Sequence, residues 1–166
     1  MSEVTVWYLQ TTAAGELTAA ADPGTATVVE AKVKQAPFNR FLYELVGGPW
    51  QWADKRGWTD EQWRDYAEAD NLRTWVAWLE GSPAGYFELQ KAADGEVEIC
   101  YFGLAEKFIG RGLGGYLLSE AIRQAWAWRA SRVVVDTCSQ DHPGALANYQ
   151  ARGMRIYKTE TKPGSL

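Results

Sequence analysis

Apolar residues that alternate with polar ones, or that are β-branched, mark seven segments of the chain as predicted β-strands. Three of these segments follow one another in the middle of the chain, separated only by Gly81-Ser82-Pro83 and by residues 91–95, which end in Asp94-Gly95. Such short turns favour antiparallel pairing, so we expect a meander there. The predicted strands cover residues 4–9, 25–33, 72–80, 84–90, 96–104, 132–136 and 154–159.

Apolar residues three or four positions apart predict four helices, which cover residues 38–46, the segment after Thr59, the segment after a glycine cluster, and residues 144–152. The order Thr59-Asp60-Glu61-Gln62 is a capping box, which places the start of the second helix. Asp141 or His142 is expected to cap the last helix, and Gly153 to end it. The long third helix has a wide apolar stripe, formed by Leu113, Leu117, Leu118, Ala121, Ile122, Ala125 and Trp126.

Composition narrows the class of protein. The 166 residues, 46% hydrophobic and 23% charged, fit one domain over residues 1–166. The formal net charge of −4 disfavours nucleic acid as a partner. Residues 1–10 carry no signal sequence and no long apolar run follows, so we expect a cytoplasmic protein without a membrane partner. Cys100 and Cys138 are predicted to be small core residues, and a single histidine, His142, disfavours a metal site.

A glycine cluster lies between a predicted strand and the long helix. Glycines at this place let backbone amides converge on an anion at the helix N-terminus, which predicts a phosphate site. The structural alternative is a tight turn with close packing of strand and helix, although four glycines exceed what a turn needs. The cluster consists of Ile109, Gly110, Arg111, Gly112, Leu113, Gly114 and Gly115.

Two other nucleotide sites use similar glycines. Gly110, Gly112 and Gly115 satisfy G-x-G-x-x-G, and Asp136 follows at a strand end, as in a dinucleotide-binding domain for NAD. Residues 105–109 separate the strand from the glycines, however, and only about 30 residues remain after Asp136 for further βαβ units. A triphosphate-binding loop would need Lys-Ser or Lys-Thr after the glycines, which is missing here. The sequence therefore favours a phosphate-containing ligand other than NAD or a nucleoside triphosphate.

The chain resembles the GNAT superfamily of acetyl-CoA-dependent N-acetyltransferases. The superfamily's loop pattern, Q/R-x-x-G-x-G/A, falls on residues 109–114, with Ile109 in the place of Gln or Arg. A second pattern, N-x-x-A followed by a Tyr and by Gly and an aromatic residue, resembles residues 142–145, Tyr149 and Gly153-Met154. His142 replaces the usual Asn, and Met154 the usual Phe. The resemblance is good over residues 84–157 and extends to the first 70 residues only in length and element order.

The resemblance and the element order imply an α/β (α+β) fold, in which helices flank both faces of a mixed, largely antiparallel sheet. Residues 1–70 would form the lobe that shapes the acceptor pocket, and residues 71–166 the acetyl-CoA-binding core. Tryptophans gather in the first lobe, where they fit either an aromatic wall for a cationic or flat acceptor or ordinary core packing.

Acetyl-CoA is the co-substrate that the resemblance implies. Amides of Gly110, Gly112 and Gly114 would hold its pyrophosphate, and Lys107 and Arg111 would add positive charge, unless these two only form a solvated loop surface. The end of the preceding strand would pair with the pantetheine arm. The residues expected to bind acetyl-CoA are Tyr101, Phe102, Gly103, Leu104, Ile109, Gly110, Arg111, Gly112, Leu113, Gly114, Gly115, His142 and Tyr149.

A general base is needed, because an amine attacks a thioester only in its neutral form. Alternation on the strand Glu96–Leu104 predicts Glu98, Cys100 and Phe102 on one face, and Ile99 and Tyr101 on the other. Glu98 would then lie at the edge of an apolar region that raises the pKa of its carboxyl group. It also matches the catalytic Glu of the superfamily's histone-modifying branch. The structural alternative is an ion pair of Glu98 with Lys91 or Arg73.

Further candidates follow on the later elements. Asp136, at a strand end, could act as a base through a water molecule or could anchor the next loop. Tyr149 matches the position of the tyrosine that the superfamily places beside the thioester sulfur, so it could protonate the leaving thiolate or simply pack in the core. Together these residues predict an N-acetyltransferase in which a primary amine attacks acetyl-CoA directly. The sequence leaves open whether the protein is a monomer or a homodimer. The alternative is a CoA-binding regulatory module without catalysis.

Overall fold

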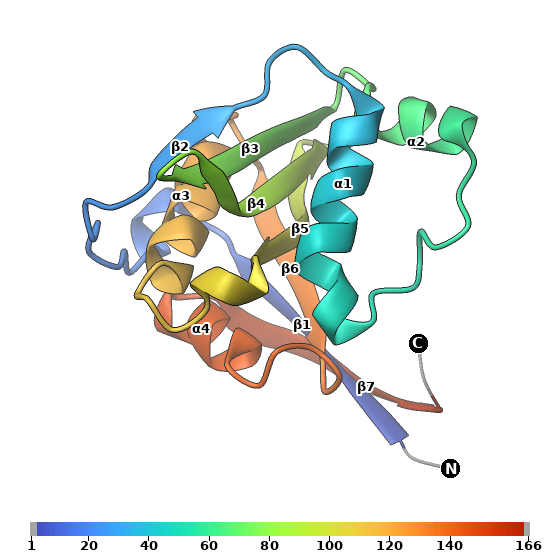
Figure 1. Ribbon diagram of the computed structural model, residues 1–166. Coiled ribbons are helices and arrows are strands. Elements are labelled where there is room, and N and C mark those ends of the chain that lie inside the picture. Colours follow the sequence, from blue (N-terminus) through green and yellow to red (C-terminus); the bar gives the residue numbers. More distant parts are fainter. Residues whose placement is uncertain (1–2, 165–166) are drawn as a thin grey trace.

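The computed structural model describes residues 3–164, and these form one seven-stranded sheet in the order β2-β3-β4-β5-β6-β1-β7 (Figure 1). All neighbouring strands pair antiparallel except β5 and β6, which are parallel. The mixed, largely antiparallel sheet predicted from the sequence is therefore confirmed. Its strands are β1 (Glu3–Thr11), β2 (Thr27–Glu30), β3 (Leu72–Leu79), β4 (Ser82–Lys91), β5 (Glu96–Leu104), β6 (Arg132–Cys138) and β7 (Arg155–Pro163).

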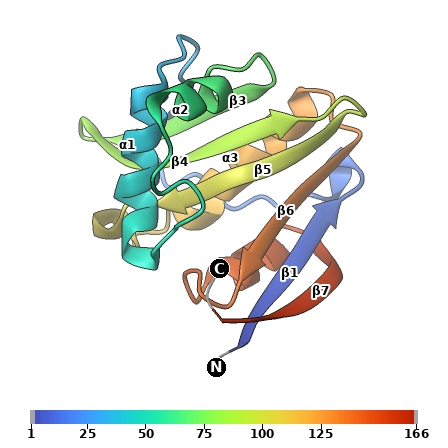
Figure 2. The ribbon, with the colours of Figure 1, turned by 90° about the vertical axis from the view of Figure 1, so that its right-hand side faces the viewer.

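Helices cover both faces of the sheet (Figures 1 and 2). On one face lie α1 (Ala36–Gly47) and α2 (Asp60–Ala67), and on the other lie α3 (Gly114–Ala127) and α4 (Ala145–Ala151). The predicted apolar stripe of α3 faces the sheet, where burial of such side chains stabilises the fold by about 1.5–3 kcal/mol each. Its fully buried members are Leu117, Leu118, Ala121, Ile122 and Ala125. No helix within residues 3–164 is both long and apolar enough to cross a bilayer.

Strands β5 and β6 pair only at their beginnings. Backbone partners run from Glu96 opposite Arg132 to Glu98 opposite Val134, and none is recorded beyond them. From there the two strands diverge, as Figure 2 shows. The sheet thus opens between the carboxyl ends of two neighbouring strands, which is a common place for a ligand site in mixed sheets.

A β-bulge in β5 changes which side chains face which layer. Glu88 of β4 lies opposite Tyr101, while the next residue of β4 lies opposite Ile99, so Cys100 has no partner. The predicted alternation is therefore wrong after Cys100. Tyr101 packs on the α1 side, with its ring 5.5 Å from that of Tyr43, whereas Phe102 packs on the α4 side. Strict alternation fails because the extra residue reverses the faces of all residues that follow it.

The structure confirms the predicted N-cap of one helix and contradicts that of another. The capping box of α2 is confirmed, since the Gln62 amide donates to Thr59 Oγ1 at 3.1 Å and the Thr59 amide donates to Gln62 Oε1 at 2.9 Å. The predicted cap of α4 is wrong, because Gly144 occupies the N-cap without a side-chain bond. Asp141 instead accepts hydrogen bonds from the Thr137 hydroxyl and the Cys138 amide, at 2.6 and 3.1 Å. It therefore holds the loop after β6 rather than the helix.

Gly153 ends α4 as predicted. Its φ of 99° lies in the left-handed region, and a Cβ atom there would stand 2.1 Å from the carbonyl oxygen of Glu16. Glycine is thus required both by the backbone conformation and by the close approach of the chain that follows β1.

Candidate active site

The opening between β5 and β6 forms a cleft of about 650 Å³. Its walls come from the diverging ends of both strands, from the glycine loop before α3, from α4, and from the connection between α1 and α2 at residues 48–59. This volume lies within the range of small-molecule sites. Residues from both halves of the chain therefore meet in one cavity, next to the point where the sheet splits.

The glycine loop presents backbone amides at one end of this cleft. Gly110 and Gly112 have φ of 85° and 80°, which a residue with a side chain adopts only with strain, and a Cβ atom on either would meet open space. Helix α3 begins at Gly114, and its first intrahelical bond starts from the Leu117 amide. The recorded hydrogen bonds of the described residues use none of the amides at 110–116. A run of donors is thus left for an anionic ligand at the positive end of the helix dipole.

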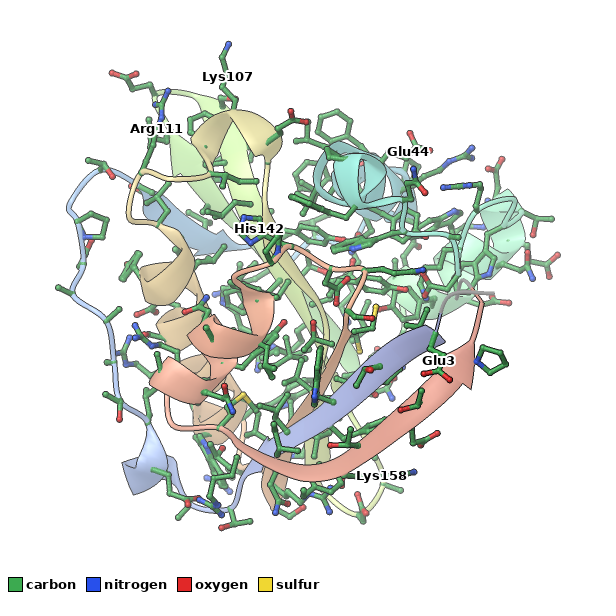
Figure 3. All side chains as sticks on the ribbon, turned by 90° about the horizontal axis from the view of Figure 1, so that it is seen from below. Glu3, Glu44, Lys107, Arg111, His142 and Lys158 are labelled. Atoms are coloured by element: carbon green, nitrogen blue, oxygen red, sulfur yellow. The ribbon has the colours of Figure 1, made fainter. Side chains whose placement is uncertain are left out.

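Charge and packing around the loop differ from residue to residue. Lys107 and Arg111 are exposed, and Figure 3 shows both side chains pointing outward from the molecule. The guanidinium of Arg111 lies 5.2 Å from the ring centre of Phe108. Gly115 is required for close packing rather than for backbone conformation, because a Cβ atom there would stand 2.7 Å from Arg152 Nη1. The loop therefore combines an anion-binding arrangement with the close packing of the structural alternative.

The edge of β5 that faces β6 is free over its second half. Strand pairing with β6 stops at Glu98, so residues 99–104 have no strand partner on that side. The backbone groups of Tyr101, Phe102, Gly103 and Leu104, all of which line the cleft, lie along this edge. Gly103 also allows α1 to approach, because a Cβ atom there would stand 2.6 Å from Val46 Cγ1. An amide-containing ligand arm could pair with such an edge in the manner of an added strand.

Glu98 is half-buried on the cleft wall, where β5 and β6 begin to separate. Burial, and then the negative charges of Asp136 and Glu96, raise the pKa of its carboxyl group. The alternative ion pairs are not formed, because Arg73 pairs with Glu30 at 2.9 Å and Lys91 Nζ donates to the Trp128 carbonyl at 2.7 Å. The structure thus leaves Glu98 on the cleft wall without either of these ion pairs.

Asp136 lies across the cleft on β6. It remains exposed to the cleft, yet the surrounding protein, and then the charge of Asp141, raise the pKa of its carboxyl group. Anchoring of the following loop, the alternative role of Asp136, is carried out by Asp141.

Cys100 and Cys138 were predicted to be core residues, but they are half-buried and line the same cleft, since both sit on the diverging strand ends.

Tyr149 projects from α4 into the cleft wall. It is buried, and its ring lies 6.2 Å from that of Phe102, so it contributes to the core as well as to the cavity. Burial, and then the charges of Asp141 and Asp136, raise the pKa of its hydroxyl group. No hydrogen bond of this hydroxyl is recorded within residues 3–164. The phenol is therefore protonated at neutral pH and has a proton to donate.

His142 lies in the loop between β6 and α4 and lines the cleft. Its Nδ1 accepts a hydrogen bond from the Gly144 amide at 2.9 Å, and its ring packs edge-on against Trp50 at 5.0 Å. Sequence reasoning missed Asn148, whose Nδ2 donates to the Gly114 carbonyl at 3.1 Å and ties α4 to the start of α3. No local pattern marks that asparagine, because its partner is distant in the chain.

The segment between α1 and α2 also contributes cleft residues that the sequence did not single out. Asp54 and Lys55 line the cleft from this segment, and Tyr66 does so from α2. The only signal in the sequence is the gathering of tryptophans at Trp50, Trp52, Trp58 and Trp63.

A split mixed sheet with an open strand edge and a glycine loop at its mouth agrees with the family that the two sequence motifs indicated. The family model described as acetyltransferase (GNAT) family matches residues 39–154, and the chain therefore belongs to the GNAT acetyltransferase family. The family predicted from the two motifs is thereby confirmed. A comparison with curated proteins finds no matching sequence.

Solved structures share the fold. A GCN5-related N-acetyltransferase from Sphaerobacter thermophilus gives a TM-score of 0.72 at 19% identity, over 98% of this chain and 53% of that chain. One from Kribbella flavida gives 0.66 at 18%, over 97% and 59%. An IAA acetyltransferase from Bacillus cereus gives 0.60 at 26% identity, over 80% and 79%. The present chain thus spans less than two thirds of the two GCN5-related proteins, so their substrates do not define its own.

Proposed function

We propose that the protein transfers the acetyl group of acetyl-CoA to a primary amine by direct attack of the amine on the thioester. The observation that carries the proposal is the single cleft in which the glycine loop, the free edge of β5, Glu98 and Tyr149 meet. The segment between α1 and α2 would form the acceptor side of this cleft. The glycine loop and α4 would form the co-substrate side.

The residues present fit acetyl-CoA, which supplies an acyl group already activated as a thioester. The unused amides at 110–116 match a pyrophosphate in number and in polarity, because a helix N-terminus favours anions. The unpaired edge at 99–104 matches the amide groups of a pantetheine arm. A backbone amide of the same edge could hold the negative charge that develops on the thioester oxygen.

Glu98 is the proposed base. A lysine-type amine has a pKa near ~10.4, so it arrives protonated and must lose a proton before it attacks. The raised pKa of the Glu98 carboxyl makes its carboxylate a better proton acceptor than an exposed glutamate. Asp136, across the same cleft, is the second candidate and would act through a water molecule.

Tyr149 is the proposed acid. Its hydroxyl group is protonated at neutral pH, as that of an ordinary tyrosine is, and the residue lines the cleft. From α4 it can donate to the sulfur atom as the carbon–sulfur bond breaks, so that the thiol rather than the thiolate is released. The amine loses its first proton to the solvent before it attacks. Glu98 then takes a second proton from the attacking nitrogen while Tyr149 gives one to the sulfur, and a proton transfer from Glu98 to Tyr149 restores both groups.

The test is thioester consumption, followed with a thiol reagent, across a panel of primary amines with acetyl-CoA. Amine-dependent release of CoA supports the proposed transfer. Calorimetric binding of acetyl-CoA without release in the presence of any amine of the panel would favour the non-catalytic CoA-binding module instead. Binding of NAD without competition by CoA would contradict both.

A further inference from the structure

The ammonium group of Lys55 lies inside a cage of three aromatic rings. Its Nζ atom is 4.2 Å from the ring centre of Trp58, 4.3 Å from that of Tyr66 and 4.9 Å from that of Tyr101. Only 11% of the Lys55 side chain is exposed. Three ring faces at such distances attract a cation through their quadrupoles, and more strongly where water is excluded. The cage is thus a cation site, and a residue of the chain itself fills it.

Two carboxylates back this cage. Asp54 Oδ2 lies 3.8 Å from Lys55 Nζ, and Asp54 accepts hydrogen bonds from the hydroxyl groups of Tyr43 and Tyr101. Behind the ring of Tyr66, the fully buried Glu88 accepts that tyrosine's hydroxyl at 2.5 Å. The rings of Tyr66 and Tyr101 are therefore held in place by hydrogen bonds, and Asp54 places a carboxylate beside the cation. Both properties suit a positively charged guest.

The cage opens on the proposed active site. Lys55, Tyr66 and Tyr101 line the same cleft as Glu98. Lys55 and Trp58 also line a second, smaller hollow of about 230 Å³, so Lys55 stands in the wall that separates the two. It belongs to the connection between α1 and α2, which Figure 2 shows outside the regular elements. Rotation of one long side chain would empty the cage and leave its three rings in place.

We propose that the cage of Trp58, Tyr66 and Tyr101 binds a protonated nitrogen of the acceptor, and that Lys55 is a tethered occupant which the acceptor displaces. The proposal rests on the proposed function and specifies its acceptor. A cage that stabilises a cation cannot hold the nitrogen that reacts, because that nitrogen must be neutral. The acceptor therefore carries two amines, one in the cage and one beside Glu98, as a diamine or polyamine does.

The step balances with this arrangement. The reacting ammonium group first releases one proton to the solvent. The neutral nitrogen then forms the new carbon–nitrogen bond and gives a second proton to Glu98, while the carbon–sulfur bond breaks and the sulfur receives a proton from Tyr149. The nitrogen in the cage keeps its charge throughout and takes no part in bond making. It therefore contributes to affinity and orientation rather than to the chemical step.

The test is calorimetric titration of the protein with 1,4-diaminobutane, without acetyl-CoA. Lys55→Ala empties the cage, so we expect it to bind the diamine about tenfold more tightly than the unaltered protein does. Adding Trp58→Leu to Lys55→Ala should remove this gain, because one ring face is lost. The neutral 1-butanol should show no gain. Lys158→Ala is the matched control, since Lys158 Nζ lies 4.9 Å from the Tyr8 ring, outside the cleft.

Three results would overturn the proposal: no gain in Lys55→Ala, an equal gain in Lys158→Ala, or a gain that survives the loss of Trp58. If circular dichroism shows that the Trp58→Leu protein is unfolded, Trp58→Phe replaces it and should give a smaller gain than an intact Trp58. Failure of the cage and failure of the proposed function are distinguishable. Diamine binding needs no thioester, whereas CoA release is measured separately with the amine panel.

Discussion

Replacement of Glu98 by glutamine separates a catalytic from a structural role for this carboxyl group. Glutamine has nearly the same volume and cannot accept the amine's proton. A general base contributes about 10²–10⁴-fold to rate, and the lower limit corresponds to about 2.7 kcal/mol of transition-state stabilisation. We therefore expect Glu98→Gln to lower kcat by about 10²-fold or more, while the calorimetric affinity for acetyl-CoA changes little.

The same variant should be more stable than the unaltered protein at neutral pH. The pKa of Glu98 is raised in the folded state, so the folded protein binds this proton more tightly than the unfolded chain does. Stability from this group is therefore present below its unfolded pKa, near 4.5, and is lost as pH rises through the folded pKa. Glutamine removes that pH-dependent loss. The stabilisation by Glu98→Gln should accordingly appear at pH 7 and vanish in acid, as followed by thermal melting.

Glu96→Gln is the matched control, because Glu96 lies on the same strand and its replacement by glutamine removes the same charge. Glu96 lies 3.7 Å from Arg132 across the pair of β5 and β6 and does not line the cleft. The charge of Glu96 contributes less to the raised pKa of Glu98 than burial and Asp136 do, so Glu96→Gln should lower kcat far less than Glu98→Gln does. The reasoning would be refuted if Glu98→Gln kept full kcat, or if both variants lost activity equally.

Three further substitutions test the rest of the site and one feature of the fold. Tyr149→Phe should lower kcat by about 10²-fold with CoA affinity retained, and full kcat would exclude Tyr149 as the acid. Gly112→Glu should abolish CoA binding in calorimetry, because it places a negative charge in the glycine loop. Gly24→Glu is its control and should bind CoA normally, because Gly24 has a similar φ of 73° and a Cβ atom there also meets open space. Gly153→Ala should lower the melting temperature well beyond Gly164→Ala, since both have positive φ but only position 153 lacks room for Cβ. Equal melting of these two variants would argue against the clash with Glu16.

Features that depend on neighbouring residues were accessible from the sequence. The capping box at Thr59, the end of α4 at Gly153 and the glycine loop before α3 each rest on the conformation of a few consecutive residues. The buried stripe of α3 follows from helical periodicity alone. The two family motifs also identified Tyr149 as a candidate site residue, because each motif is a short pattern that can be recognised from the sequence alone.

Features that depend on pairing between distant segments were not accessible. The bulge at Cys100 arises only where β5 meets β4, and it turns Tyr101 toward α1 against the alternation of the sequence. The sequence also could not decide whether Glu98 forms an ion pair with Arg73 or Lys91. The structure shows that Arg73 instead pairs with Glu30 and that Lys91 donates to the Trp128 carbonyl.

The sequence by itself determined the order of strands and helices, the glycine loop and the family, because each of these is encoded in residues that are close along the chain. Tertiary structure alone decided where β5 and β6 part, how the carboxylates of Glu98 and Asp136 come to face one cleft, and which rings surround Lys55. Those arrangements join residues from separate elements. Their geometry follows from how the layers pack, which periodicity along a single chain does not encode.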